Sequence, residues 1–293
     1  MTMARPATEA GNRAGQAADN DTCYVPTSVI PMDQSNISKT FTVEQVGAVA
    51  VLSINRVNKR NALNDAAISE LHAYFEQVGP EVRAVVIEGH GDHFCAGLDL
   101  SEVRGRTAVE AMHHSRAWHH AFERIQFGRV PVVTVLKGAV VGGGIELAAA
   151  SHIRVAEPSA FYALPEGQRG LFVGGGGSVR ISRLIGVPCM TDMMLTGRVL
   201  NAAEGQSAGI SQYLVGTGQG LKKAMELAQK IAENVPTTNY AILHVLPRIA
   251  EQSINDGLMT EALMAAVAQS DPRTQEKLTE FLEFKRNKVR PDP

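Results

Sequence analysis

Apolar residues in the first two thirds of this 293-residue chain follow two different spacings. Segments in which they alternate with polar residues or run together predict β-strands, and these are residues 41–46, 48–54, 84–87, 132–136 and 153–156. Segments in which they recur every three or four residues predict helices, and these are residues 65–78, 109–127 and 142–150. Because strands and helices alternate along the chain, the pattern predicts an α/β sheet with helical cover.

The pattern changes beyond about Leu221, where helical segments follow one another with no strand between them. We expect these segments to be separated at Pro236, Pro247, Gly257 and Pro272. Residues 1–37, by contrast, are rich in small and polar residues and show no hydrophobic periodicity. The predicted parts are therefore a disordered or loosely docked extension at 1–37, a core that contains the active site at 38–205, and a helical layer at 206–293.

Composition and charge exclude several classes of protein. Lysine and arginine number 28 and aspartate and glutamate number 30, so the net charge of −2 creates no general attraction to nucleic acid or to an anionic membrane. Lys137 and Glu146 interrupt the apolar stretch from Val130 to Ala150, which leaves no run of the roughly 18 to 20 residues that a membrane span needs. The three cysteines have neither the number of a disulfide framework nor the spacing of a metal site. We expect a cytoplasmic protein that binds no metal.

Two glycine-containing segments lie where backbone amides could bind a ligand. FCAGLDL, residues 94–100, follows the strand at 84–87, and KGAVVGGGIELAAA, residues 137–150, leads from a strand through three glycines into a helix. Small residues let the backbone approach a ligand closely, and a helix N-terminus directs free N–H groups at one point. Together the segments could form an oxyanion hole. Singly, each could also be a tight connection or a phosphate site, although the second lacks the G-x-G-x-x-G spacing of a dinucleotide-binding fold.

A third segment, ALPEGQRGLFVGGGGSVRISRLIG at residues 163–186, places a carboxylate directly after a proline and then a glycine cluster before a helix. With these segments in order, between RVNKRNAL at 56–63 and LTGRVLNAAEGQSAGI at 195–210, the chain resembles the crotonase (enoyl-CoA hydratase/isomerase) superfamily. The resemblance implies an α/β crotonase-like spiral of ββα turns with a C-terminal helical layer that assembles a homotrimer or a dimer of trimers. It also implies an acyl-CoA substrate and no separate cofactor, because coenzyme A is part of the substrate.

The resemblance assigns four catalytic positions. In the family, two backbone N–H groups hold the thioester oxygen, and they correspond to those of Leu98 and Gly143. Hydratases add two glutamates, which correspond to Glu146 and Glu166. Adding water to an unsaturated thioester needs a base for the water, an acid for the α-carbon and donors for the enolate oxygen, and this set supplies all three. Singly, Glu146 could instead stabilise a helix dipole, and Glu166 could be a solvated loop residue.

The resemblance also predicts the residues that bind the substrate. The family holds the adenine end of coenzyme A on the backbone that corresponds to Asn61, Ala62 and Leu63, with a basic residue, here Lys59, near the phosphates. Trp118 lies on the helix that lines the acyl pocket in the family, so it either shapes substrate choice or packs in the core. Around the two oxyanion segments, substrate contacts are expected at Ala96, Gly97, Asp99 and Gly142.

Because both glutamates are present, we predict an enoyl-CoA hydratase that adds water across the 2,3-double bond. The alternatives are an isomerase or a hydratase-lyase on the same fold, or a non-catalytic acyl-CoA-binding protein. His152 stands where hydratases of the family usually carry an aspartate, and we expect local hydrogen bonds to hold it rather than a pH-dependent charge to form there. The histidines at 113, 114, 119 and 120 lack the i, i+4 spacing of a helical zinc site and are expected to line a pocket or face solvent.

Overall fold

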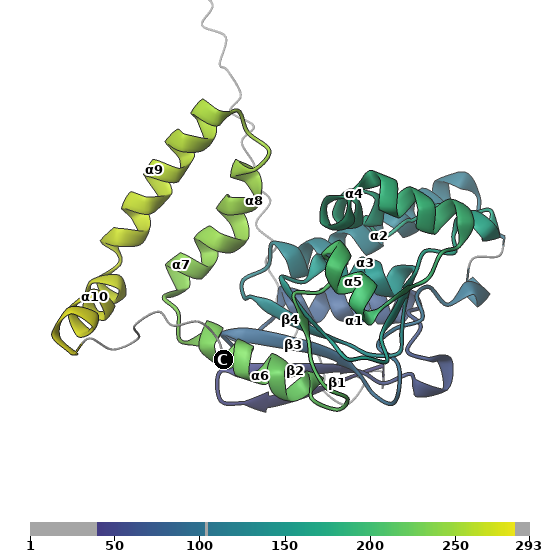
Figure 1. Ribbon diagram of the computed structural model, residues 1–293, viewed down its shortest axis with the longest axis horizontal. Coiled ribbons are helices and arrows are strands. Elements are labelled where there is room, and N and C mark those ends of the chain that lie inside the picture. Colours follow the sequence, from purple (N-terminus) through teal and green to yellow (C-terminus); the bar gives the residue numbers. More distant parts are fainter. Residues whose placement is uncertain (1–39, 103–104, 285–293) are drawn as a thin grey trace, which may run out of the picture. The chain divides into compact units, whose positions relative to one another are not determined.

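Six strands form the larger of two sheets in the computed structural model, which describes residues 40–102 and 105–284 (Figure 1). In spatial order they are β1 (Phe41–Val46), β2 (Val49–Ile54), β3 (Ala84–Gly89), β4 (Val132–Leu136), β6 (Ile153–Ala156) and β9 (Tyr213–Leu214). β1 and β2 pair antiparallel, and the other neighbours in this sheet pair parallel. The smaller sheet contains β5 (Ala139–Val141), β7 (Phe161–Ala163) and β8 (Leu200–Asn201). The predicted extension at 1–37 lies outside the described residues.

Helices connect these strands, and local sequence sets where they begin. The first five are α1 (Asp65–Glu76), α2 (Ala108–Gln126), α3 (Gly143–Ala150), α4 (Gly177–Thr196) and α5 (Ala202–Ala208). The side chain of Asn64 accepts a hydrogen bond from Ala67 N at the start of α1, and Thr107 and Glu110 form a capping box at the start of α2. Short 3₁₀ turns lie at Val57–Lys59 (η2), Leu100–Glu102 (η3) and Gly167–Arg169 (η4).

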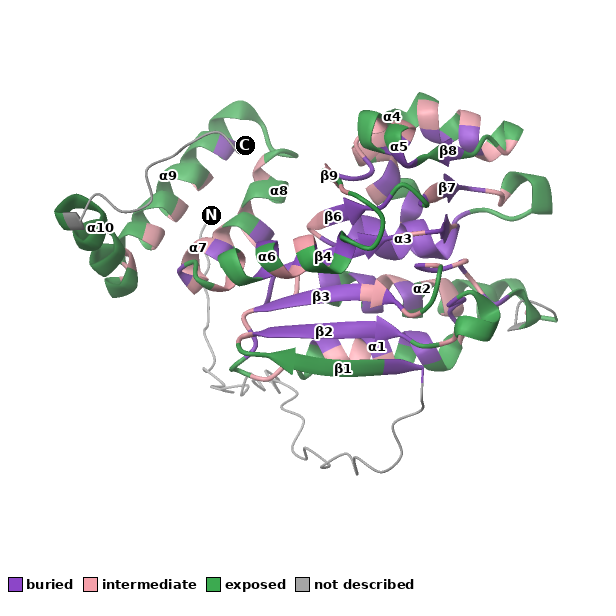
Figure 2. Cartoon of the chain, turned by 60° about the horizontal axis from the view of Figure 1, so that its bottom comes forward, coloured by how far each residue is buried: buried purple, intermediate pink, exposed green. Residues whose placement is uncertain are grey.

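The central strands of the larger sheet are buried on both faces (Figure 2). On one face, Val85 and Ile87 of β3 belong to the main core, which also contains buried residues of α1, α2 and α3. On the other face, Ala84 and Val86 of the same strand pack with Leu227 of α6 (Gly220–Ala232). Burial on both sides explains why residues 84–87 are all apolar and residues 132–136 are apolar except for Thr134, with no alternation of apolar and polar residues. The predicted α/β sheet with helical cover is confirmed.

Among the described residues, the C-terminal part of the chain after β9 is helical. After α6 come α7 (Pro236–Tyr240), the π-helical turn η5 (Ala241–Val245), α8 (Leu246–Ile249), α9 (Ile254–Ser270) and α10 (Pro272–Phe284). Pro236 and Pro272 are the first residues of α7 and α10, so the breaks predicted at these two prolines are confirmed. The break predicted at Gly257 is wrong, because Gly257 lies inside α9, beside Ile249 of α8. The helical layer also begins later than predicted, because β9 still belongs to the sheet. No helix in the described ranges is long and apolar enough to cross a membrane.

Candidate active site

The first predicted oxyanion segment is fixed by strand-like pairing on both sides. Parallel β-bridges join Leu63 to Leu98 and Cys95 to Val140. In the first bridge, Leu63 donates to the carbonyl of Gly97 and accepts from the amide of Asp99, each over 2.8 Å. The amide of Leu98 itself donates no hydrogen bond to any described residue. It is therefore held rigidly and is available to a ligand.

The second segment turns from β5 into α3 directly beside the first. Gly142 has φ of 52° and ψ of −119°, a conformation that needs glycine, and Gly143 is the first residue of α3. A Cβ on Gly97 would lie 3.1 Å from Gly143 N, and a Cβ on Gly143 would lie 3.3 Å from Leu98 N. The amides of Leu98 and Gly143 are thus neighbours at the positive end of a helix, where they can stabilise one negatively charged oxygen.

Glu146 lies in the first turn of α3 and is 3% exposed. Its Oε1 accepts hydrogen bonds from the amides of Gly175 and Gly177, both over 2.8 Å. Burial raises the pKa of this carboxyl from 4.5 to about 7, while the two amides act in the opposite direction and the charge of Glu166 raises it further. Glu146 can therefore exchange a proton near neutral pH.

Glu166 follows Pro165 in the loop between β7 and η4 and is half-buried. Burial raises the pKa of its carboxyl, and the charge of Arg169 partly offsets this effect. Its Oε2 is buried and has no hydrogen-bond partner among the described residues. Its Oε1 faces Gly142, on which a Cβ would lie only 2.7 Å away. A buried carboxyl oxygen without a partner is costly, so its position beside the oxyanion segments marks it as a group that meets a ligand.

One cavity of about 60 Å³ brings the four predicted catalytic positions together. Leu98, Gly143, Glu146 and Glu166 all line it, as do three of the predicted substrate-binding residues, Ala96, Gly97 and Gly142. Its remaining lining is mostly apolar and is contributed by Leu100, Val141, Leu171, Phe172, Val173 and Gly174, together with Arg169. The cavity can hold a small unsaturated group between two carboxyls with its carbonyl oxygen at two amides.

Comparison with known proteins identifies the family of this chain. The family model described as enoyl-CoA hydratase/isomerase matches residues 44–289. The chain belongs to this family. It is thus an enzyme of the crotonase superfamily.

Individual members of the enoyl-CoA hydratase/isomerase family match over most of the chain. The short-chain-enoyl-CoA hydratase of Clostridium acetobutylicum is 30% identical over 232 residues, which are 78% of this chain and 86% of that protein. A solved structure from Rhodopseudomonas palustris CGA009, provisionally assigned as an enoyl-CoA hydratase, is 56% identical with a TM-score of 0.83 and covers 86% of this chain and 97% of its own. The enoyl-CoA hydratase structure from Bacillus anthracis is 30% identical with a TM-score of 0.78, covering 84% and 96%. The predicted crotonase fold is confirmed.

In this member of the enoyl-CoA hydratase/isomerase family, several of the predicted substrate-binding residues also make contacts that hold the active site together. Asn61 is fully buried, and its amide nitrogen donates to the carbonyls of His90 and His93 over 2.9 and 2.7 Å. Its Oδ1 accepts from the amide of Arg56 over 3.0 Å. The side chain of Asn61 is thus used within the protein, and the predicted contact of its backbone with coenzyme A stays a prediction.

Arg56 contacts two more of the predicted substrate-binding residues, Ala62 and Asp99. Its guanidinium donates to the carbonyl of Ala62 and forms an ion pair of 3.0 Å with Asp99. A hydrogen bond from Ser101, and after it the one from Arg56, lowers the pKa of the Asp99 carboxyl. The backbone of Leu63 is used in the bridge to Leu98. Asp99, Ala62 and Leu63 do not line the 60 Å³ cavity, and their contacts with the substrate stay a prediction. Lys59 is exposed in η2.

The histidines have structural positions. His152 is half-buried; Val132 N donates to its Nδ1 over 2.9 Å, and its Nε2 lies 3.0 Å from the carbonyl of Gln126. Burial lowers the pKa of His152 to about 4, so the ring is neutral and donates from Nε2. His152 is thus held by hydrogen bonds, as predicted, but its partners are not local, because they lie 20 and 26 residues away in the sequence. Of the four histidines at 113–120, His114 and His120 line a second cavity. No group of three possible metal ligands occurs in the described part of the chain.

The residues that hold Glu146 were not found from the sequence. The glycine cluster at 174–177 was noted only for its position before a helix, yet its amides bind the carboxyl of Glu146. Ser115 Oγ donates to Gly174 O over 2.6 Å, and Arg180 donates to Gly175 O over 3.1 Å, so both fix this loop. Four glycines in a row before a helix were the available signal, because such a loop presents free amides.

The raised pKa of Glu146 makes stability depend on pH. The pKa of Glu146 is about 7 in the folded protein and 4.5 in the unfolded chain, so the folded protein binds this proton more tightly. The resulting gain in the free energy of unfolding is fully present below pH 4.5 and is lost as the pH rises through 7. Glu146→Gln, which still offers an oxygen to Gly175 and Gly177, should remove this dependence. Urea unfolding should show the variant gaining about 3 kcal/mol relative to the parent between pH 5 and 8. If the free energies of unfolding of the two proteins differ by the same amount at pH 5 and at pH 8, the raised pKa of Glu146 is contradicted.

Proposed function

We propose that this protein is an enoyl-CoA hydratase, which adds water across the 2,3-double bond of an enoyl-CoA thioester. The observation that carries the proposal is that Glu146 and Glu166 line one cavity with the adjacent amides of Leu98 and Gly143. Two carboxyls and two aligned N–H donors are the groups that hydration requires. The name of the Clostridium acetobutylicum relative supports the same reaction.

The reaction follows from these positions. The thioester oxygen accepts hydrogen bonds from Leu98 N–H and Gly143 N–H. One ionised glutamate takes a proton from water while the water oxygen bonds to C3, and the π electrons move toward the thioester, whose oxygen gains enolate charge. The other glutamate, protonated, gives its proton to C2. A C3–O and a C2–H bond replace the π bond, and the pair ends with the number of protons it began with. Burial raises the pKa of both carboxyls, which favours one shared proton near neutral pH.

Coenzyme A enters this scheme as part of the acyl-CoA substrate, and no further cofactor takes part. Lys59 is the basic residue that we assign to the phosphates, since it is exposed and the carbonyl of the next residue, Arg60, accepts a hydrogen bond from the amide of Ala96 in the oxyanion segment. The test is to incubate the protein with crotonyl-CoA and to identify the product by mass spectrometry. We expect 3-hydroxybutyryl-CoA, heavier than the substrate by one water. Recovery of unchanged substrate would argue for a non-catalytic acyl-CoA-binding protein.

The two other reactions open to this fold give different products. An isomerase would interconvert 2-enoyl-CoA and 3-enoyl-CoA with no gain in mass. A hydratase-lyase acting on an aryl enoyl-CoA would release an aldehyde after hydration. A panel of aliphatic and aryl enoyl-CoAs, analysed for all three products, separates them.

We further propose that α9 and α10 mediate assembly into a homotrimer or a dimer of trimers. Large apolar side chains on these helices are exposed in the single chain, at Ile254, Leu258, Met259, Leu263, Val267, Leu278, Phe281 and Leu282. Contiguous exposed apolar surface is typical of a protein–protein interface. Light scattering coupled to gel filtration should give a mass of three or six chains.

A further inference from the structure

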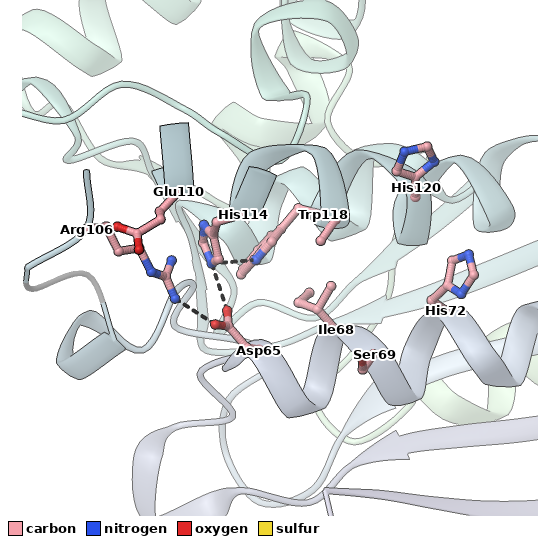
Figure 3. Close-up of a pocket in the computed structure, with 10 residues that line it drawn as sticks. Asp65, Ile68, Ser69, His72, Arg106, Glu110, His114, Trp118 and His120 are labelled. Atoms are coloured by element: carbon pink, nitrogen blue, oxygen red, sulfur yellow. Dashed lines mark hydrogen bonds and ion pairs between the residues drawn. The ribbon is translucent and has the colours of Figure 1, made fainter. Parts of the chain in front are cut away.

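Helix α2 presents polar side chains to two different neighbours. On the face toward α1, His114 Nε2 lies 2.9 Å from Asp65 Oδ1 (Figure 3). On another face, Ser115 contacts the glycine loop at 174–177, and Gln126, about three helical turns further on, contacts α4. The proposed mechanism assigns no step to either group. The second group leads, through the glycine loop, to the catalytic cavity of about 60 Å³, because Gly174 lines that cavity.

The glycine loop is a single layer of backbone between the side chains of Glu146 and Arg180. Gly175 joins them directly, since its amide donates to Glu146 Oε1 over 2.8 Å and its carbonyl accepts from Arg180 Nη1 over 3.1 Å. A Cβ on Gly177 would lie 2.8 Å from Glu146 Oε1, and a Cβ on Gly176 would collide with Arg180 Nη1. Side chains at these positions would therefore push the loop away from one group or the other.

Arg180 is half-buried, and α2 fixes its orientation. Its Nε donates to Gln126 Oε1 over 2.7 Å while Nη1 reaches Gly175 O. Because the guanidinium is planar and rigid, holding one edge of it also directs the other edge. The preceding peptide group is held in a similar way, since Ser115 Oγ donates to Gly174 O over 2.6 Å. One side chain from α2 and one from α4 thus set the direction in which the loop amides point.

The charged and titratable groups around this unit come from several elements. Burial raises the pKa of Glu146, the two loop amides lower it, the charge of Glu166 raises it and the charge of Arg180 lowers it. Burial lowers the pKa of Arg180, and the charges of Glu146 and then of Glu123 on α2 oppose this effect. Burial and then the charge of Arg180 lower the pKa of His119 on α2, so this ring is neutral at pH 7. Arg180 thus opposes both burial and Glu166 at the carboxyl of Glu146.

From this arrangement we propose that Arg180 is a positioning residue for Glu146, which holds the glycine loop against the carboxyl and places a positive charge on the far side of that loop. The inference rests on the proposed hydration reaction. Arg180 does not line the catalytic cavity, so it acts on Glu146 and not on the substrate. Its loss should therefore lower kcat more than substrate binding. Its loss should also move proton transfer to higher pH, because its charge and the loop hydrogen bonds both favour the ionised carboxyl.

The test measures kcat and KM for crotonyl-CoA as a function of pH in Arg180→Met and Arg180→Lys. Arg180→Met should lower kcat by about 10²-fold with little change in KM, since misplacing a reacting group by about 1 Å has an effect of this size. The limb of its pH profile near pH 7, where Glu146 titrates, should move to higher pH. Arg180→Lys keeps the charge and should bring this limb back toward that of the parent. It should restore only part of kcat, because an ammonium group lacks the rigid fork that joins Gln126 to Gly175.

Arg183 offers a matched control on the same helix. It is exposed, forms an ion pair of 2.8 Å with Glu251 and donates to Val179 O. Arg183→Met should therefore keep the kcat and the pH profile of the parent. A folded Arg180→Met protein with the kcat and the pH profile of the parent would overturn the proposal. So would an equal loss of kcat in Arg183→Met, because it would indicate a general effect on α4.

A second measurement does not depend on turnover. Urea unfolding at pH 5 and at pH 8 compares Arg180→Met with the double variant that also carries Glu146→Gln. The effect of Glu146→Gln on the free energy of unfolding should change more between these pH values than it does in the parent, because without Arg180 the carboxyl binds its proton up to a higher pH. An equal change in both backgrounds would overturn the proposal. If the parent hydrates no enoyl-CoA, the proposed function fails, and the unfolding experiment by itself decides whether Arg180 acts on Glu146.

Discussion

Replacing Glu146 or Glu166 with glutamine is expected to lower kcat for the hydration of crotonyl-CoA by about 10²- to 10⁴-fold. Each change removes one proton-transfer group and preserves its shape. At position 146 the amide oxygen of glutamine can still accept from Gly175 and Gly177, so the glycine loop should stay in place. Binding of a saturated acyl-CoA, measured by calorimetry, should change little, since the loss belongs to the transition state.

The chain offers a matched control for this experiment. Glu157 is also a buried glutamate whose Oε1 accepts a backbone hydrogen bond, from Gly220 N over 2.9 Å, but it does not line the catalytic cavity. Glu157→Gln should therefore keep the parent's kcat. Turnover at the parent's rate in either active-site variant would rule out the proposed hydratase mechanism, whereas an equal loss in Glu157→Gln would indicate a general effect on folding.

The second large effect is expected at Gly143, whose N–H is one of two proposed oxyanion donors. Gly143→Ala and Gly143→Pro both introduce a Cβ that would meet the ring of Trp118 at 2.7 to 2.9 Å, so both should reduce turnover. Only proline also removes the N–H, and it is tolerated at the first position of a helix. The proline variant should therefore lose about a further 10²- to 10³-fold in kcat relative to the alanine variant.

Combining each Gly143 variant with Trp118→Leu separates steric and electrostatic causes. The smaller side chain should relieve the steric conflict and restore much of the alanine variant's turnover of crotonyl-CoA. It should not restore the turnover of the proline variant, because proline at position 143 still lacks the N–H that donates to the enolate oxygen. Equal turnover in folded alanine and proline variants would mean that the enolate oxygen is stabilised elsewhere.

The sequence by itself determined the order of the longer elements and the residue types of the site. Apolar spacing located β4 at Val132–Leu136 without error, and the predicted helix at 109–127 lies within one residue of α2. Strands β5, β7, β8 and β9 were missed, because two or three residues do not show a period and such strands exist only through pairing with distant partners. The spacing of Glu146 from Gly143 was also readable, since one helical turn carries both.

Tertiary structure decided what each of these residues contacts. The side chain of Asn61 donates to the carbonyls of His90 and His93, about 30 residues away, and no pattern near Asn61 in the sequence indicates these contacts. The pKa of Glu146 depends on burial and on amides that come from another segment. Whether Trp118 packs in the core or shapes substrate choice was open from the sequence; the fold buries its side chain in the core beside Gly143, and its effect on substrate choice stays a prediction. Hydrogen bonding and desolvation depend on neighbours in space, and local spacing along the chain carries no information about them.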